Sequence, residues 1–255
     1  MIHDLINSIN IFTHFPKCKD CPGCQATKTP RASCRLKGEA KPDDFKEPEK
    51  FADRITLDHQ ILNKQEDDGE LLLPWSPDSK PKVSLIIQDA YSKFLGSYPS
   101  HAKAHKEIIM AVKRFLGPGT PALHAYSDNS NEIIAAMEEM GILHDTSTPY
   151  CPESNGVIER AGRRVKEGTS ACLVQSGLNE VFWDLATMCY CFLRNVVDLL
   201  LDGETAWKKR FGTDYNGPSW LFGCEVLYKP NNPDDEKRIH KYGNKTLAGI
   251  FVGYH

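Results

Sequence analysis

Three carboxylates are the residues of this chain whose types and positions could do chemistry. Asp58 lies inside the apolar stretch ITLDHQIL (55–62), Asp128 follows the stretch ALHAYS (122–127), and Glu159 lies near the start of a helix-like segment. An acid inside an apolar strand is costly to bury unless it is paired, protonated or bound to a metal ion. If the three acids converge, divalent cations would relieve their mutual repulsion, and Mg²⁺ or Mn²⁺ suits a set of carboxylate oxygens.

Basic residues crowd the segment that follows Glu159. Two metal ions about 4 Å apart can activate a water or hydroxyl and stabilise the leaving oxygen of a phosphodiester. Basic side chains beside such a site would hold the polyanionic backbone. The candidates for DNA contact are Asn155, Arg160, Arg163, Arg164 and Lys166. The simpler alternative is a solvated surface helix with a Glu159–Arg163 pair at i,i+4, worth a few tenths of a kcal/mol.

Cysteines form the second group with chemical potential. Four of the nine, Cys18, Cys21, Cys24 and Cys34, lie within the first 34 residues. Nothing resembles a signal peptide, and an intracellular chain seldom carries a disulfide framework, so this crowding indicates a metal site. The Cys21-x-x-Cys24 spacing suits tetrahedral Zn²⁺, with His14 or His3 as the imidazole ligand and Cys18 as a further thiolate. The alternative is a tail with free thiols.

Composition limits the class of protein. The chain has 255 residues, 40% hydrophobic and 25% charged, which is ordinary for a globular protein. Its formal net charge of -3 means that any DNA-binding surface must be local. The longest apolar run, Val181 to Leu201, contains Asp184, Arg194 and Asp198, so a buried helix is a better interpretation than a membrane span. We expect a nuclear or cytoplasmic protein without membrane attachment.

Three other polar groups have ordinary explanations. Strand alternation turns His59 to the face opposite Asp58, where packing explains it. Asp89 ends an apolar strand before a turn and would cap that turn. His144 and Asp145 follow a strand, and no role is assigned to them.

The elements that must position these residues follow from hydrophobic periodicity. The pattern predicts three strands, then helix, strand, helix, strand and two helices, which implies an α/β fold with a mixed sheet flanked by helices. The predicted strands are 55–62, two within 83–99 joined by a turn at Ala90–Lys93, 122–127 and the ILHDT stretch. The predicted helices are within 101–117, Asn131–Met140, Asn155 to about Gln175, and the NEVFWDLATMCYCFLRNVV stretch. Residues 69–81 are expected to form an irregular insertion.

Composition divides the chain into three parts. Residues 1–50 hold the Cys/His segment and a Lys-, Pro- and Asp-rich linker, and residues 51–201 hold the alternating strands and helices. Residues 202–255 form an irregular C-terminal extension with short strands at CEVLY and LAGIFVGY.

Several motifs together resemble a known family. LDHQIL around Asp58, YSDNSNE around Asp128 and TPYCPESNGVIER up to Arg160 resemble the integrases of copia-like retrotransposons, within the DDE transposase and retroviral integrase superfamily. The run PESNGVIER (152–160) is the most specific match. NEVFWDLATMCYCFLRN, WLFGCEVLYKP and LAGIFVGY resemble the segments that follow in copia-like proteins. The resemblance covers roughly residues 14–255.

The resemblance implies a ribonuclease-H-like core with five strands and a metal-binding triad of Asp58, Asp128 and Glu159. The implied activity is metal-dependent 3′-end processing and strand transfer of element DNA into target DNA, by a homo-oligomer that handles two DNA ends. Such integrases begin with a zinc-stabilised His-His-Cys-Cys module, which here would be truncated, with His14, Cys21 and Cys24 as its remainder. Two alternatives are a catalytically silent DNA-binding or scaffold remnant and a hydrolytic ribonuclease-H-like nuclease.

The chain departs from the family pattern at two places. Thirty residues separate Asp128 from Glu159, several fewer than usual, and Asp128-Asn129-Ser130 replaces the usual Asp-Asn-Gly. Both changes bear on the efficiency of the chain as an integrase.

Overall fold

A computed structural model gives the fold of this protein. It describes residues 12–15, 18, 21–27, 47–61, 81–146 and 156–254. The predicted insertion at 69–81 therefore lies outside the described residues apart from residue 81, and so does the whole TPYCPESN run.

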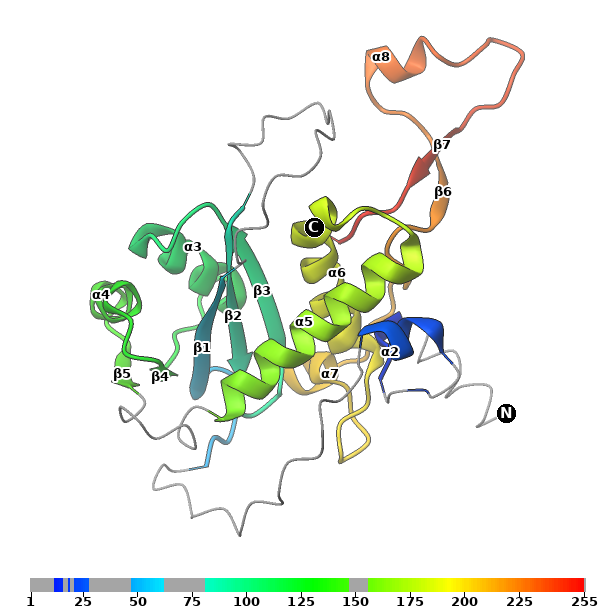
Figure 1. The fold of residues 1–255 in the computed structure, drawn as a ribbon. Helices are drawn as coiled ribbons and strands as arrows, with labels where there is room; N and C mark the ends of the chain where they lie inside the picture. The colour runs from blue at the N-terminus through cyan, green and yellow to red at the C-terminus, as the bar shows by residue number, and fades with distance from the viewer. Residues whose placement is uncertain are drawn as a thin grey trace.

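A five-stranded mixed sheet forms the centre of the molecule, in the order β3-β2-β1-β4-β5 (Figure 1). β1 is antiparallel to β2 and β2 to β3, whereas β1, β4 and β5 are parallel neighbours. Central β1 therefore lies beside β4, although more than sixty residues separate them in the chain. The strands are β1 (Arg54–Ile61), β2 (Val83–Asp89), β3 (Leu95–Ser100), β4 (His124–Ser127) and β5 (Leu143–Thr146).

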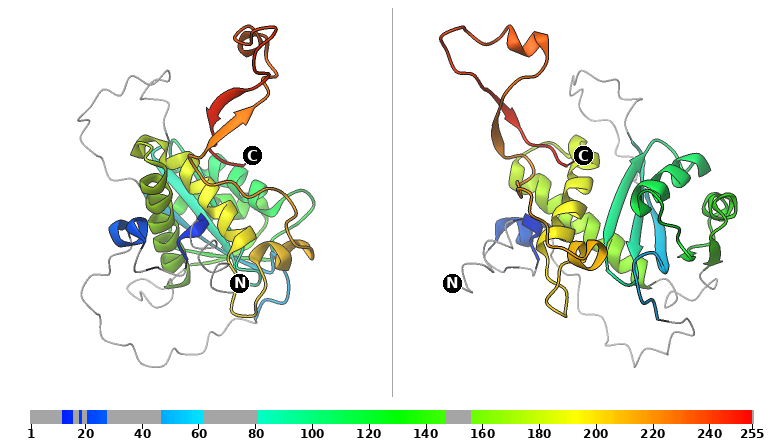
Figure 2. Two further views of the ribbon diagram at one scale, coloured as in Figure 1. Left: turned by 90° about the vertical axis from the view of Figure 1, so that its right-hand side faces the viewer. Right: turned by 180° about the vertical axis from the view of Figure 1, so that it is seen from behind.

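Helices cover both faces of the sheet. α3 (His105–Leu116) and α4 (Asn131–Met140) lie on one side, and α5 (Gly156–Ser176) and α6 (Trp183–Val197) on the other (Figures 1 and 2). A short 3₁₀ turn, Glu180–Phe182, leads into α6. This arrangement is the predicted α/β fold with a mixed sheet between helical layers.

Each face of the sheet has its own hydrophobic core. Ile55 and Leu57 of β1 pack with the helices α3 and α4, while Ile86 of β2 packs with α5 and α6. Because side chains alternate along a strand, Asp58 faces the α5 layer and His59 the α3–α4 layer. The sequence prediction that these two neighbours point to opposite faces is confirmed.

α6 also protects the edge strand β3. The Asn195 side chain accepts a hydrogen bond from the Leu95 backbone N–H (2.9 Å) and donates one to the Leu95 carbonyl (2.8 Å). The Thr187 hydroxyl donates to Ser97 Oγ (2.9 Å). The two Asn195 contacts satisfy backbone groups that an edge strand would otherwise expose, and all three contacts fix α6 against the sheet.

The C-terminal residues begin on the core and then leave it. α7 (Ala206–Phe211) packs beside α6, and the Arg210 guanidinium lies 4.2 Å from the Phe51 ring centre and 4.3 Å from that of Phe94. Tyr254 stacks on Phe192 at 4.0 Å between ring centres. Between these anchors, the chain projects from the body as β6 (Glu225–Tyr228), α8 (Pro233–Glu236) and β7 (Leu247–Ile250) (Figure 2).

The predicted order of strands and helices in the core is confirmed, with boundaries within a few residues. β6 and β7 occupy the two short strands predicted in the extension. Among the helices whose bounds are described, three were not predicted: α7, α8 and the N-terminal α2 (Pro22–Thr27). Two of them have six residues and one has four, too short for hydrophobic periodicity to reveal. No helix in the described ranges has the length and apolar character that crossing a membrane requires.

Candidate active site and a second, Cys/His group

The sheet register brings Asp58 and Asp128 onto neighbouring strands. Leu57 of β1 is paired with Ser127, the last residue of β4, so the two aspartates are the next residues along two parallel chains about 4.8 Å apart. Glu159 lies in the first turn of α5, directly after the fully buried Ile158 that anchors this helix to the sheet. Three acids far apart in the sequence thus belong to adjoining elements.

Electrostatic coupling shows that the three acids share one neighbourhood. Burial raises the pKa of Asp58, and the charges of Asp128 and Glu159 raise it further, against a backbone hydrogen bond from His59 and the charge of Lys103, which lower it; the result is about 6. A pKa raised first by burial and then by two neighbouring acids makes this carboxyl a candidate functional group.

Two further observations distinguish this cluster from ordinary surface acids. Asp128 Oδ1 is buried and has no hydrogen-bond partner among the described residues. Glu159 is exposed, and within the described ranges it forms no ion pair with Arg163 or any other residue. The simple interpretation of Glu159 as half of an i,i+4 surface pair therefore lacks its contact.

Lys103 is a member of this neighbourhood that the sequence did not single out. It lies in the loop between β3 and α3, and its charge lowers the pKa values of Asp58, His59 and Glu132. No sequence motif marks it; only the parallel direction of β1 and β3 brings its loop to the same end of the strands as Asp58. His59 itself has a buried Nδ1 without a partner in the described part of the chain, and burial lowers its pKa.

The basic residues of α5 do not all face the same surroundings. Arg160, Arg163 and Lys166 are exposed, and Arg160 Nε donates to the Gly156 carbonyl at 2.8 Å. Arg164 is half-buried, with its guanidinium 5.9 Å from the ring centre of Phe15 in the N-terminal segment. Asn155, the fifth candidate for DNA contact, lies outside the described residues.

The predicted Cys/His residues also come together. His14 Nδ1 lies 3.3 Å from Cys21 Sγ and 3.6 Å from Cys24 Sγ, and the three ligand atoms all lie within 4.8 Å of one another. Cys18 is described but is not part of this group. No comparable group of three is found for the carboxylates in the described ranges, so the acid site is the wider of the two.

Asp89 has the capping role that the sequence predicted. Its carboxylate accepts hydrogen bonds from the Ser92 backbone N–H (2.6 Å) and the Ser92 hydroxyl (2.7 Å) within the turn, and from the Ala52 N–H at 2.9 Å. On the other side of β1, His144 Nε2 lies 2.9 Å from Ser127 Oγ, and His124 pairs with Asp145 at 2.7 Å. These contacts give Asp89, His124, His144 and Asp145 structural explanations.

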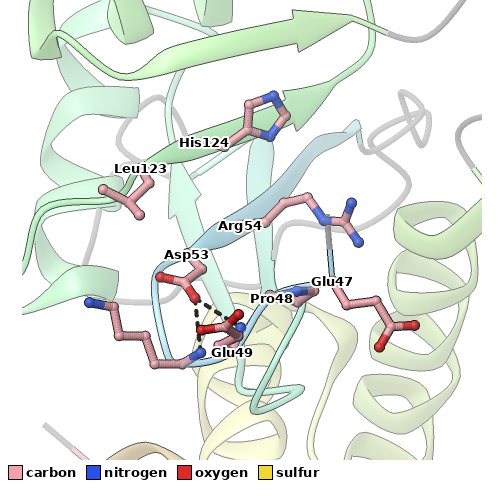
Figure 3. A pocket seen from close by; sticks show the side chains of 8 residues that line it. Glu47, Pro48, Glu49, Asp53, Arg54, Leu123 and His124 are labelled. Atoms are coloured by element: carbon pink, nitrogen blue, oxygen red, sulfur yellow. Dashed lines mark hydrogen bonds between the residues drawn. The ribbon is translucent and has the colours of Figure 1, made fainter. Parts of the chain in front are cut away.

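A cavity of about 440 Å³ lies away from the acid site, at the start of β1 and β4, where Asp53 accepts hydrogen bonds from the backbone N–H groups of Glu49 and Lys50 (Figure 3). Its lining mixes acids with Arg54 and His124 and includes none of the three clustered carboxylates.

The fold and the relatives identify the class of protein. The architecture is the ribonuclease-H-like fold of integrase catalytic cores. A solved structure of the simian T-cell lymphotropic virus intasome in complex with PP2A regulatory subunit B56 gamma is similar, with a TM-score of 0.52 and 16% identity, over 90% of this chain and 76% of that one. The HTLV-2 integrase catalytic core in complex with magnesium scores 0.46 at 17% identity, over 64% and 98%.

Sequence relatives confirm the resemblance to copia-like elements. The chain is 31% identical over 178 residues to a retrovirus-related Pol polyprotein from transposon RE1 of Arabidopsis thaliana, and 30% identical over 163 residues to that of transposon TNT 1-94 of Nicotiana tabacum. The matches cover 67% and 60% of this chain but 12% and 11% of those polyproteins. No family model matches. The homologues are thus retrovirus-related Pol polyproteins of copia-like transposons, of which this chain spans a small part.

Proposed function

We propose that this chain is an integrase-type polynucleotidyl transferase, which nicks DNA ends with water and joins the new 3′-hydroxyls to target DNA. The observation that carries the proposal is the gathering of Asp58, Asp128 and Glu159 on β1, after β4 and at the start of α5. Similarity to the Pol polyproteins supports the same class of reaction.

The acid site fits divalent cations by its own chemistry. It offers carboxylate oxygens, one of which is buried without a partner in the described residues, and its central carboxyl has a pKa raised by burial and by the other two acids. Hard oxygen donors of this kind suit Mg²⁺ or Mn²⁺. When bound, a pair of such ions supplies activation of the attacking hydroxyl and charge stabilisation on the phosphodiester. Asp58 and Asp128 would hold them, and Glu159 would complete the coordination shell of the second ion.

The remaining residues would position the nucleic acid. Arg160, Arg163 and Lys166 are exposed on the same helix as Glu159, where they can contact phosphate oxygens. Lys103 reaches the acid site from the opposite layer and is a further candidate for a phosphate contact. Because two DNA ends must be joined to one target, we propose a homo-oligomer as the working form. The Cys/His group is proposed to hold Zn²⁺ separately.

A joining assay tests the proposal. The full chain is incubated with Mg²⁺ or Mn²⁺, labelled short duplexes with recessed 3′-hydroxyl ends, and a supercoiled plasmid as target. We expect joined product from the wild type and a loss of about 10³-fold in Asp128→Asn, since removing one charge-stabilising group from such a site costs about that much. The matched control is Asp145→Asn, an aspartate of β5 that pairs with His124 outside the acid cluster.

Other results would contradict the proposal in distinguishable ways. Plasmid nicking without joining would identify a hydrolytic nuclease. DNA binding that is indifferent to metal, with neither nicking nor joining, would identify a silent scaffold. Equal joining by the wild type and Asp128→Asn would mean that the acid cluster takes no part in the reaction.

A further inference from the structure

The geometry of the Cys/His group matches a tetrahedral metal site. With Zn–S near 2.3 Å and Zn–N near 2.05 Å, a tetrahedral ion separates its nitrogen and sulfur ligands by about 3.6 Å. The observed separations from His14 Nδ1 to the two sulfurs are 3.3 and 3.6 Å. His14 and Cys24 are buried, with 2% and 0% of their surface exposed, and Cys21 is half-buried.

A fourth residue, Gln175, decides which nitrogen of His14 can bind. His14 Nε2 lies 3.1 Å from Oε1 of Gln175, near the end of α5. An amide oxygen only accepts hydrogen bonds, so this contact places the imidazole proton on Nε2. The lone pair is then on Nδ1, which faces both sulfurs. Ligating histidines commonly have their other nitrogen fixed in this way, and loss of such a partner weakens metal affinity.

Close packing holds the imidazole in that orientation. A Cβ added to Gly23 would lie 3.1 Å from His14 Cε1, so a larger residue at the start of α2 would press on the ring. His14 also has a positive φ of 54°, a backbone conformation that is uncommon outside glycine. A metal ion bound by His14 and the two thiols would offset the free-energy cost of this backbone conformation.

The residues around His14 attach the segment to the core. The Thr13 hydroxyl donates to Asp198 Oδ1 at 2.5 Å, just after α6, and Phe12 packs against the hydrophobic cluster under α5 and α6. Arg164 lies over Phe15, and α2 lies against α5 (Figure 1). The Cys/His group is therefore built against the helix that carries Glu159, rather than on a separate module.

We propose that Gln175 is a positioning residue for a Zn²⁺-type centre at His14, Cys21 and Cys24, and that the occupied centre attaches residues 12–15 and 21–27 to α5. Metal binding would then stabilise the helix that presents Glu159 at its other end. The inference rests on the proposed zinc centre but not on any DNA chemistry, so it stands or fails independently of the joining assay.

Cobalt binding by the full chain tests the positioning role. Metal-stripped protein is titrated with Co²⁺, whose thiolate absorption reports ligation, and then with Zn²⁺ in competition. We expect Gln175→Ala to bind 10- to 100-fold more weakly, about the loss seen for such outer partners. Gln175→Glu, which keeps an oxygen acceptor, should restore the affinity. Val174→Ala, at the exposed neighbouring position, is the matched control and should bind like the wild type.

Two outcomes would overturn the proposal. A metal affinity of Gln175→Ala within twofold of that of the wild type would show that Gln175 has no positioning role. Unchanged metal content in Cys21→Ser/Cys24→Ser would show that these residues do not form a metal centre.

Hydrogen exchange tests the attachment. Zn²⁺ should slow amide exchange along residues 156–176 as well as 21–27 in the wild type, and should change neither in Cys21→Ser/Cys24→Ser. Slowing confined to residues 21–27 would show that the centre does not hold α5.

Discussion

The two ends of α5 carry two opposite kinds of ligand set. Near its start, Glu159 is exposed and adjoins Asp58 and Asp128, which repel one another. Among the described residues, neither aspartate has a cationic side chain at hydrogen-bond distance. Near its end, Gln175 adjoins a buried imidazole and two sulfurs already in mutual contact. Glu159 and Gln175 are sixteen positions apart on the helix, which at 1.5 Å per residue is about 24 Å.

Under the proposed function, one helix would serve both stability and chemistry. A closed, buried set of nitrogen and sulfur ligands is typical of structural metal sites, whereas an open set of oxygens leaves positions for substrate. Because burial and the two neighbouring acids raise the pKa of Asp58, its ionised form lowers the stability of the fold. The Cys/His end is arranged to contribute stability. The helix between them must be rigid for either end to influence the other.

Gly168, about midway along α5, tests that rigidity and should give the largest effect on stability. A Cβ at Gly168 would overlap the ring of Tyr190, which is fully buried in α6. We expect Gly168→Ala to destabilise the protein by about 1–3 kcal/mol through overpacking, which lowers Tm by roughly 2–10 °C for a chain of this size. Thermal unfolding measures the change.

Gly162→Ala is the matched control on the same helix. No described atom lies within 4 Å of a Cβ at that position, so helix propensity alone should act and raise stability by up to about 1 kcal/mol. If both variants change Tm equally, the close contact of α5 and α6 is not what holds the helix.

The pH dependence of stability distinguishes the acid end and should be a smaller effect. The pKa of Asp58 is raised from 3.8 to about 6 in the fold. A raised acid favours the folded state while it is protonated, so this stability is present below about pH 4 and is lost as pH rises through about 6. Allowing for partial solvent screening, the loss is roughly 1–2 kcal/mol.

Urea unfolding without Mg²⁺ or Mn²⁺ measures this term. Asp58→Asn should be more stable than the wild type at pH 7.5 and similar to it at pH 4, while Asp214→Asn, at an exposed position, should show no such difference. Addition of Mn²⁺ at pH 7.5 should stabilise the wild type but not Asp58→Asn. A pH profile identical in the wild type and Asp58→Asn would mean that the acids do not interact.

Much of the acid end could be predicted from sequence because each acid belongs to a strong local pattern. Asp58 interrupts an apolar strand, Asp128 ends another, and Ile158, Ala161, Val165 and Cys172 mark the buried face of α5 that leaves Glu159 at its edge. The catalytic role of the three acids and of the basic residues stays a prediction.

The contacts of the Cys/His end could be predicted only in part. The Cys21–Cys24 spacing pointed to metal, but Gln175 lies 161 residues from His14 and Asp198 lies 185 from Thr13. No periodicity or local motif links residues so distant; tertiary packing alone brings them together. Lys103 was missed for the same reason, since its position depends on which strands become neighbours.

The exposed arginine Arg163 should give the smallest effect and separates binding from chemistry at the acid end. Replacing one phosphate-contacting cation removes about one released counterion, so Arg163→Gln should bind duplex DNA a few-fold more weakly and flatten the dependence of log affinity on log salt by about 1. Fluorescence anisotropy at several salt concentrations measures both quantities. The control is Arg114→Gln, also exposed, on α3 across the sheet. An equal loss of DNA affinity in both variants would mean that DNA is attracted to positive charge in general. It would also mean that α5 is not a specific contact surface for the nucleic acid.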